Sequence, residues 1–390
     1  MRPRFLPLAL ILFLAACAEP EPQIYYKGNL HTHTFWSDGD DFPEQVVDWY
    51  VDNGWDFVAL SDHNTLAEGD RWIEITENIS STYAEYIAAD AMNVRERREG
   101  GKIFVRLTTF EELAGRFNRP GQFLLIQSEE ISDGFDEKPL HVNATNVHHH
   151  IHPQGGSSVT DVLQRNIDAV LAQRDSTGQP MVPHVNHPNF GWAVTPDDLV
   201  PLVGEHFFEV YNGHPAVHNE GDDGRPGTEA MWDYVNTQRL AEGRSLLFGL
   251  AVDDAHHYQE MRTGLANPGR GWVMVQADTL TAGSVIAALE AGRFYGSSGV
   301  TLQRVEFTGR RLQIEIEEEE GVFYTTYFVG TREGGEPGQL FATVEGPEAE
   351  YRMRSEDVFV RATIVSTKPM ANPYVEGETE KAWVQPVQRR

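Results

Sequence analysis

The sequence has little that could cross-link it or draw it to nucleic acid. Its single cysteine, Cys17, rules out an intramolecular disulfide. Lys and Arg total only 31 against 59 Asp and Glu, which gives a formal net charge of −28 over 390 residues. A surface this acidic repels phosphate backbones, so we expect no nucleic-acid partner. Hydrophobic residues make up 40% of the chain, which is enough for a substantial core.

Long apolar runs are absent except at the N-terminus, where residues 1–17 are typical of an export signal. Their last four residues read Leu-Ala-Ala-Cys and resemble the lipobox of bacterial lipoproteins, which implies cleavage before Cys17 and lipid attachment to its thiol. An uncleaved anchor or an ordinary secretory signal is the alternative. Residues 18–23 would form a short tether, and Ala18 resembles the start of lipoproteins sent to the outer membrane. We therefore expect a lipid-anchored protein at the periplasmic face of that membrane.

Residues 24–300 alternate short apolar runs with amphipathic segments. The strand candidates are Ile24–Leu30, Phe57–Leu60, Phe123–Gln127, His141–Val147, Met181–Val185, Phe207–Val210, Leu246–Leu250 and Trp272–Val275. The helix candidates are Pro43–Asn53, Val159–Gln173 and Thr281–Ala291. This alternation predicts a parallel α/β architecture closed as a barrel, with the functional loops after the carboxyl ends of the strands.

Two further regions depart from this alternation. Residues 65–122 are long for one connection, and the helix-like stretch Thr82–Arg98 predicts an inserted helical subdomain, a candidate lid. After residue 300 the pattern changes to short β-type runs with turn residues between them. We predict that residues 301–390 form a small β-rich, sandwich-like C-terminal domain.

Histidines and carboxylates gather at the ends of the predicted strands. His31 and His33 are one residue apart, so on a strand both side chains point to the same side. Similar clusters follow five later runs: Asp62-His63, Glu129-Glu130, His141, His184 to His187, and Asp253 to His257. A barrel would present them all at one mouth. Imidazole and carboxylate together suit Zn, Mn or Fe, so the sequence predicts a metal site.

This ordered set resembles the PHP (polymerase and histidinol phosphatase) metallohydrolase family over about residues 28–300. The carbaryl-hydrolase-like branch is closest in pattern, through Glu129-Glu130-Ile131-Ser132 and the run Ala291–Gly299. The resemblance implies a distorted (β/α)7 barrel that carries a trinuclear metal site.

The resemblance also implies three groups of metal ligands. The first group is His31, His33, Glu130 and Asp254. The second is Glu130, as a bridging carboxylate, with His141 and His187. The third is Asp38, His63 and His256, in which Asp38 departs from relatives that place a histidine nearby. We expect two or three divalent ions, with Zn, Mn and Fe as the candidates.

Such a site predicts a metal-dependent hydrolase. A hydroxide between two ions forms near neutral pH, because the pKa of bound water falls toward about 7, and it would attack a small phosphoester. The expected catalytic residues are Glu130, Asp254, His256 and Asp253. The sequence lacks a Gly-x-Ser-x-Gly motif, which argues against a serine nucleophile. The alternatives are a carbamate, amide or carboxylic ester hydrolase on the same site, and a non-catalytic periplasmic metal- or ligand-binding lipoprotein.

Several neighbours of these ligands have open roles. Asp62 is a candidate to orient His63, and Glu209 to brace a ligand or bind substrate. The candidates for a general acid are Asp253, His184 and His257. Arg270 and Arg293 are candidates to meet an anionic substrate. The tract His148–His152 is either an accessory metal site or a solvated loop.

Overall fold

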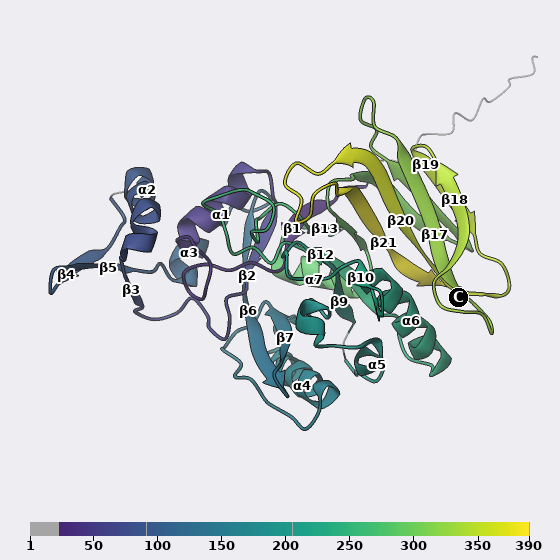
Figure 1. Cartoon of the computed structure of the whole chain (residues 1–390), viewed down its shortest axis with the longest axis horizontal. Coiled ribbons are helices and arrows are strands. Elements are labelled where there is room, and N and C mark those ends of the chain that lie inside the picture. The colour runs from purple at the N-terminus through teal and green to yellow at the C-terminus, as the bar shows by residue number, and fades with distance from the viewer. Residues whose placement is uncertain (1–22, 91, 205, 390) are drawn as a thin grey trace, which may run out of the picture.

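A computed structural model describes residues 23–90, 92–204 and 206–389 of the protein (Figure 1). It shows a mixed α/β fold with a β-rich C-terminal part, which confirms the predicted class. The export signal, Cys17 and all but the last residue of the predicted tether lie outside the described residues. Within the described ranges, no helix is long and apolar enough to cross a bilayer.

One sheet of thirteen strands runs through the molecule. Its first seven strands, in spatial order, are β12 (Phe248–Val252), β9 (Phe207–Asn212), β8 (Val182–Val185), β7 (Lys138–Thr145), β6 (Leu124–Phe135), β2 (Phe57–Leu60) and β1 (Tyr26–Asn29). The sheet continues through β13 (Trp272–Val275), β14 (Phe294–Ser297), β21 (Thr379–Gln388), β20 (Asp357–Pro369), β17 (Tyr324–Arg332) and β18 (Gln339–Glu345).

The segments that follow the two ends of the seven-strand run, β12 and β1, lie side by side. The segments that follow β1 and β12 form the parallel bridge Thr32–Ala255. The backbone N–H of His33 donates to the carbonyl of Ala255 (3.0 Å), and that of Asp254 donates to the carbonyl of His31 (3.1 Å). The run therefore returns on itself through a single bridge, and this bridge holds the predicted ligands of β1 and β12 side by side.

The sheet is not wholly parallel, as the strand–helix alternation had led us to expect. β7 runs antiparallel to both β6 and β8, whereas the β1–β2, β2–β6, β8–β9 and β9–β12 pairs are parallel. Only Asp136 and Glu137 separate β6 from β7, and both have left-handed φ values (49° and 62°). A two-residue turn of this kind can join only antiparallel strands, which explains the reversal.

Helices cover the outer face of this run. The principal ones are α1 (Pro43–Asp52), α4 (Val159–Thr177), α6 (Thr228–Ala241), α7 (Ala282–Glu290) and the short α5 (Pro196–Leu199). The α4 helix begins where the Ser158 side chain accepts a hydrogen bond from the backbone of Asp161, and it ends at Gly178 in the left-handed region. Its buried face, with Val162 and Ile167, packs in one core with residues of β8 and β9.

The insertion between β2 and β6 is only partly helical. It contains α2 (Ser80–Asp90), α3 (Phe110–Phe117) and an antiparallel sheet of β3 (Trp72–Glu74), β5 (Lys102–Arg106) and β4 (Glu96–Glu99). The predicted helix Thr82–Arg98 is therefore wrong beyond residue 90. Gly100 and Gly101 both take positive φ values and turn β4 directly into β5, which pairs the charged β4 as a hairpin strand.

The C-terminal part extends the large sheet and covers it with a second one. β14 pairs with β21, so the C-terminal strands continue the same large sheet. β15 (Leu302–Thr308), β16 (Arg311–Ile316) and β19 (Glu348–Arg352) form the second sheet. Ile314, Phe328 and Ile364 share one core between the two sheets. This part and the β3–β5–β4 insertion lie at opposite ends of the long axis (Figure 1).

Candidate metal centre

The strand ends bring the predicted ligands together from distant parts of the sequence. His31 and His33 follow β1, His141 lies on β7, and His187 follows β8. His63 follows β2 and forms a bridge with Glu130 on β6. Asp254 and His256 follow β12, and Asp254 takes a left-handed φ of 51° that turns the chain at this point. All nine predicted ligands belong to groups of donor atoms close enough to share an ion.

The first ligand group is compact and buried. The Nε2 atoms of His31 and His33 each lie 3.3 Å from Glu130 Oε2 and 3.3 Å from Asp254 Oδ1. Both histidine Nε2 atoms and Glu130 Oε2 are buried with no hydrogen-bond partner. Donors that bind one tetrahedral ion at about 2.0–2.2 Å lie about 3.3–3.6 Å from one another. The four side chains therefore fit a divalent transition ion.

The second group uses the other oxygen of the same glutamate. Glu130 Oε1 lies 2.7 Å from His141 Nδ1 and 3.3 Å from His187 Nε2. The amide of Asn186 also donates to this oxygen (2.7 Å) and fixes the carboxylate in place. Glu130 therefore faces two groups of histidines with its two oxygens, as a bridging carboxylate does in a two-metal site.

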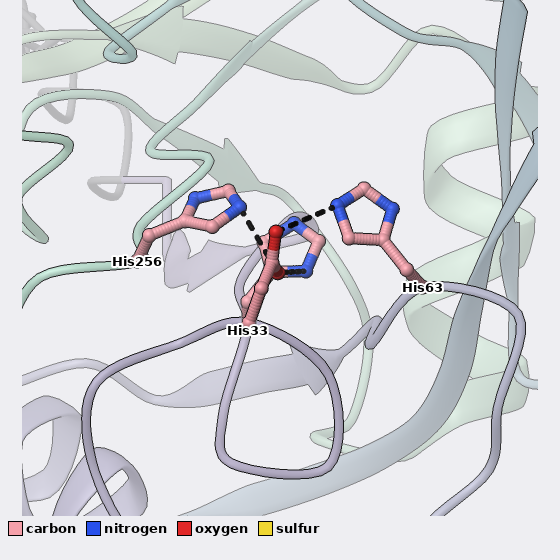
Figure 2. A group of neighbouring side chains, drawn as sticks. His33, His63 and His256 are labelled. Atoms are coloured by element: carbon pink, nitrogen blue, oxygen red, sulfur yellow. Dashed lines mark ion pairs between the residues drawn. The ribbon is translucent and has the colours of Figure 1, made fainter.

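The third group is the most open. Asp38 Oδ1 lies 3.4 Å from His256 Nε2, and its Oδ2 lies 3.6 Å from His63 Nε2. The rings of His63 and His256 stand on either side of His33, with ring centroids 4.5 and 4.0 Å from it (Figure 2). The Asp38 side chain is 58% exposed, unlike the buried carboxylates of the first group. This group therefore forms the solvent edge of the centre.

The charges of the centre suit metal binding. Burial would raise the pKa of Glu130, but His63, His141 and His31 outweigh it and hold this pKa well below its ordinary value. Burial, reinforced by His256, lowers the pKa of His33 to about 3. A charged carboxylate and a neutral imidazole are the forms that ligate metals, and Glu130 and His33 are already in these forms at neutral pH. The surrounding carboxylates outweigh burial and raise the pKa of His31 and His63, the latter to about 9, so these two ligands would release a proton when an ion binds.

Glu209 braces the histidines and takes the first of its two open roles. Its Oε1 lies 2.6 Å from His31 Nδ1 and 3.2 Å from His184 Nε2. Its Oε2 accepts hydrogen bonds from the backbone of His187 (2.7 Å) and from the Asn212 amide (2.8 Å). A separation of 2.6 Å is a hydrogen bond, so the Glu209 carboxylate orients the ring of His31. The ring of His184 makes its own hydrogen bond with the same carboxylate oxygen.

Asp62 shapes the loop that carries Asp38. Its Oδ1 accepts hydrogen bonds from the Thr34 backbone (2.8 Å) and the Ser37 hydroxyl (2.7 Å), and its Oδ2 accepts from the Thr34 hydroxyl (2.9 Å). Gly39 closes the same loop, and a Cβ there would lie 2.7 Å from the His33 backbone. Asp62 therefore positions Asp38 rather than His63.

Asp253, which we expected among the catalytic residues, does not lie with the other three. Its Oδ1 accepts from the backbone N–H groups of Arg270 (2.7 Å) and Gly271 (2.8 Å), and its Oδ2 accepts from the Tyr50 hydroxyl (3.0 Å). Asp253 and Asp254 are consecutive, but the chain turns at Asp254, and only Asp254 lies beside His31 and His33. Asp253 therefore holds the interior of the fold together.

The other open candidates also serve the fold. The buried Arg270 guanidinium donates to the carbonyls of Gly213 (2.9 Å) and Asn372 (2.9 Å). The His257 ring accepts from the Ala266 backbone (3.2 Å). Arg293 lines a separate cavity of about 290 Å³ whose walls include residues of β14, β15 and β21. His257 belongs to no ligand group found among the described residues.

His214 is a residue of the centre that sequence reasoning missed. Its ring lies 5.5 Å from that of His256, and its Nδ1 accepts from the Ala216 backbone (3.1 Å), so its Nε2 carries the proton of the neutral ring. Burial, with help from His256, lowers its pKa to about 4. The signal was present, because His214 follows the carboxyl end of β9 as the ligands follow theirs.

No protein-family model matches the sequence, and no curated protein matches it. A two-domain protein from Bacteroides vulgatus containing a predicted PHP-like metal-dependent phosphoesterase is similar over 95% of this chain and 100% of its own, with 14% identity and a TM-score of 0.40. A proposed metal-dependent phosphoesterase from Bifidobacterium adolescentis is similar over 59% of this chain and 87% of its own (14% identity, TM-score 0.30). An amidohydrolase from Chromobacterium violaceum, with bound sulfate and no metal, is similar over 31% and 28% (19% identity, TM-score 0.17). The chain itself presents a mixed α/β fold whose His, Asp and Glu clusters could hold metal ions.

Proposed function

We propose that the protein is a metal-dependent hydrolase of the PHP type, acting on a small phosphoester. The observation that carries this proposal is the Glu130 carboxylate, whose two oxygens face two separate groups of histidines. Divalent ions held by these groups would lower the pKa of bound water and polarise an ester oxygen. Ligands buried as deeply as His31, His33 and Glu130 would exclude competing bulk water from the ions.

The charge of the donor set favours an anionic substrate. Only three carboxylates, those of Asp38, Glu130 and Asp254, belong to the proposed ligand set. They would offset half the charge of three divalent ions, so the mouth would be positive although the whole chain is acidic. Exposed charges farther away than about 8 Å are largely screened at physiological ionic strength. A phosphoester can therefore approach through the open edge at Asp38.

Two further side chains are placed to contact the substrate. His214 would donate a hydrogen bond from Nε2 to a substrate oxygen. Phe190 lies beside it, with ring centroids 5.8 Å from His214 and 5.1 Å from His187, and would form an apolar wall for the leaving group. The residues of this chain therefore supply both a donor and a surface for the organic part of the ester.

A substrate panel tests the proposal. Metal-free protein would be reconstituted with Zn²⁺ or Mn²⁺ and assayed on nitrophenyl phosphate, bis-nitrophenyl phosphate and nitrophenyl acetate. Hydrolysis of a phosphoester that a chelator abolishes would support the proposal. Hydrolysis of the carboxylic ester alone would replace it with the carboxylic ester alternative on the same site. No turnover with ions bound would favour a binding protein.

We also propose that Cys17 carries a lipid that holds the protein at the periplasmic face of the outer membrane. The sequence of residues 14–17 supports this proposal. Cells fed a radiolabelled fatty acid should label the parent protein and leave a Cys17→Ser variant unlabelled. Equal labelling of the two proteins, or none of either, would refute it.

A further inference from the structure

A second group of unpartnered donors lies behind the candidate centre, on the other face of β6. Glu129 precedes the bridging Glu130 and points away from it, toward the loop of residues 148–152. Its side chain is fully buried. Its Oε1 accepts a hydrogen bond from the Ile151 backbone (2.6 Å), while its Oε2 is buried and has no hydrogen-bond partner.

His150 presents a matching atom to this carboxylate. Its Nε2 lies 3.3 Å from Glu129 Oε2 and is also buried without a hydrogen-bond partner. Burial and the neighbouring His152 lower the pKa of His150. A hydrogen bond with the Asn64 backbone raises this pKa by less, so the ring is neutral at pH 7. A ring nitrogen that bonds to a backbone carbonyl leaves the other nitrogen free as a metal ligand.

The gap between these two atoms has the spacing found in the first ligand group. There too, imidazole Nε2 and carboxylate oxygen atoms face each other at 3.3 Å without a hydrogen-bond partner. Two buried lone pairs that face each other repel unless a cation or a proton lies between them. Burial, reinforced by Glu68, raises the pKa of Glu129 to about 8, so in the metal-free protein at neutral pH a proton occupies this gap. A cation that displaces this proton would meet two fixed donors at a point that the candidate centre does not use.

We propose that Glu129 and His150 hold an accessory divalent transition ion, such as Zn²⁺, behind β6. The remaining ligands would be water molecules, since the ring of His152 lies 4.4 Å from that of His150 but His152 completes no group of three donor atoms among the described residues. The exposed carboxylate of Glu68 is near enough to act electrostatically on both Glu129 and His150. The imidazole donors favour a transition ion over Mg²⁺ or Ca²⁺.

The role of this ion is structural. It would tie the loop after β7 to the back of β6, directly behind the residue that bridges the catalytic groups. The other half of the histidine tract is held differently, since the backbone N–H groups of His148 and His149 both donate to Gln173 on α4 (2.7 and 3.0 Å). The tract His148–His152 is therefore divided between α4 and β6, and only its second half faces an unpartnered carboxylate.

Elemental mass spectrometry of zinc-loaded protein tests the proposal. His150→Ala should lose one ion per chain relative to the parent. Glu129→Gln should lose the same ion, since the amide keeps an acceptor for Ile151 but cannot ligate as an anion. Hydrolytic activity should be unchanged in both variants. The same loss should occur in a Glu130→Gln background, which separates this site from the catalytic centre and from any failure of the proposed function.

His149→Ala is the matched control and should keep the full count. An anomalous-scattering map at the zinc edge should show a peak between Glu129 Oε2 and His150 Nε2. Equal ion counts in the parent and His150→Ala would overturn the proposal. They would mean that a proton, and not an ion, lies between Glu129 and His150. An equal loss in His149→Ala would overturn it too, because that loss would mark the tract as a non-specific chelator.

Discussion

The imidazole of His31 and the carboxylate of Glu209 form a hydrogen bond of 2.6 Å in which both side chains are fully buried. The bond joins the first ligand of the chain to a strand 178 residues later. It leaves the other ring nitrogen of His31 to face Glu130 and Asp254. A buried carboxylate in this position orients a ligand and raises its basicity.

Glu209→Gln should therefore weaken metal binding by about 10–100-fold, the usual effect of losing such a partner. The amide preserves the shape but not the charge opposite His31. The dissociation constant for Zn²⁺, measured by competition with a chromogenic chelator, checks this expectation. Glu44→Gln is the control, since Glu44 is a buried carboxylate that accepts hydrogen bonds from Tyr86 and Thr108 and belongs to no ligand group among the described residues. Equal constants for the parent and Glu209→Gln would contradict the bracing role.

Glu130→Gln should lose bound ions and lower kcat by on the order of 10³-fold, comparable to or greater than the loss of one electrostatic catalytic group. An amide cannot serve two groups of histidines as a bridging anion. Ion counts and turnover of the phosphoester identified in the panel are the measurements. Glu129→Gln is the matched control on the opposite face of the same strand, and it should keep its turnover. A Glu130→Gln variant with normal activity would exclude the bridging role.

Asp38→Asn should remove one ion and leave the others, because the shortest contacts of Asp38 to predicted ligands are with His256 (3.4 Å) and His63 (3.6 Å) of the third group, and His33 of the first group lies farther away, at 3.8 Å. Turnover should fall by less than in Glu130→Gln. Metal analysis together with kcat and KM would show the effect. Asp52→Asn, on the exposed end of α1, serves as the surface control. Retention of every ion in Asp38→Asn would reduce the centre to its two buried groups.

Asp41 should make stability depend on pH. Burial, with help from the nearby Asp40, raises the pKa of Asp41 from 3.8 to about 7. Between about pH 4 and about pH 7 the folded protein therefore keeps a proton that the unfolded chain has released. The free energy of unfolding falls as pH rises through this range, because ionisation favours the unfolded chain. Asp41→Asn cannot ionise, so its stability relative to the parent should increase across this range, by at most about 4 kcal/mol.

Urea unfolding of the metal-free proteins at about pH 4 and about pH 8 measures this change. The Asp52→Asn variant should show no such trend, since Asp52 is exposed. A constant difference between Asp41→Asn and the parent at both pH values would mean that Asp41 is ionised throughout in the folded state.

Arg361 should contribute strongly to the free energy of unfolding, because it ties β20 to two carboxylates of α6. It is 2% exposed, and its guanidinium makes two 2.7 Å hydrogen bonds to Asp233 and one of 2.9 Å to Glu229. Arg361→Ala leaves the Asp233 carboxylate buried without its cation, at a cost of about 3–5 kcal/mol in the free energy of unfolding. Glu229 is 34% exposed and keeps hydrogen bonds from Thr363 and Trp383, so it adds less to this cost. Arg304→Ala, which removes an ion pair near the surface of β15, should cost less than about 1 kcal/mol. Similar values for the two variants in urea titrations would disprove the difference.

The order of the donors along the chain was readable from the sequence because each donor follows a strand. Phe57–Leu60 and Trp272–Val275 form strands within the predicted limits, and His31, His63 and Asp254 follow theirs. A carboxyl end of a strand is recognisable locally, from an apolar run that stops at polar residues. The predicted set of nine ligands rested on this local pattern and on the resemblance to a family.

Which of two neighbours faces the centre was decided only by the tertiary structure. The alternation of strand side chains says that Glu129 and Glu130 point to opposite sides. It does not say which side carries the histidines, because both carboxylates are buried and both faces of β6 are covered. For the same reason the unpartnered pair of Glu129 and His150 could not be read from the sequence.

Long-range pairing was likewise beyond the sequence. The bond from His31 to Glu209, the bridge from Thr32 to Ala255 and the continuation of the large sheet from β14 into β21 each join segments far apart along the chain. Local patterns determine the elements and the types of donor. The packing of the whole chain determines which donors meet, since burial and distance depend on every element at once.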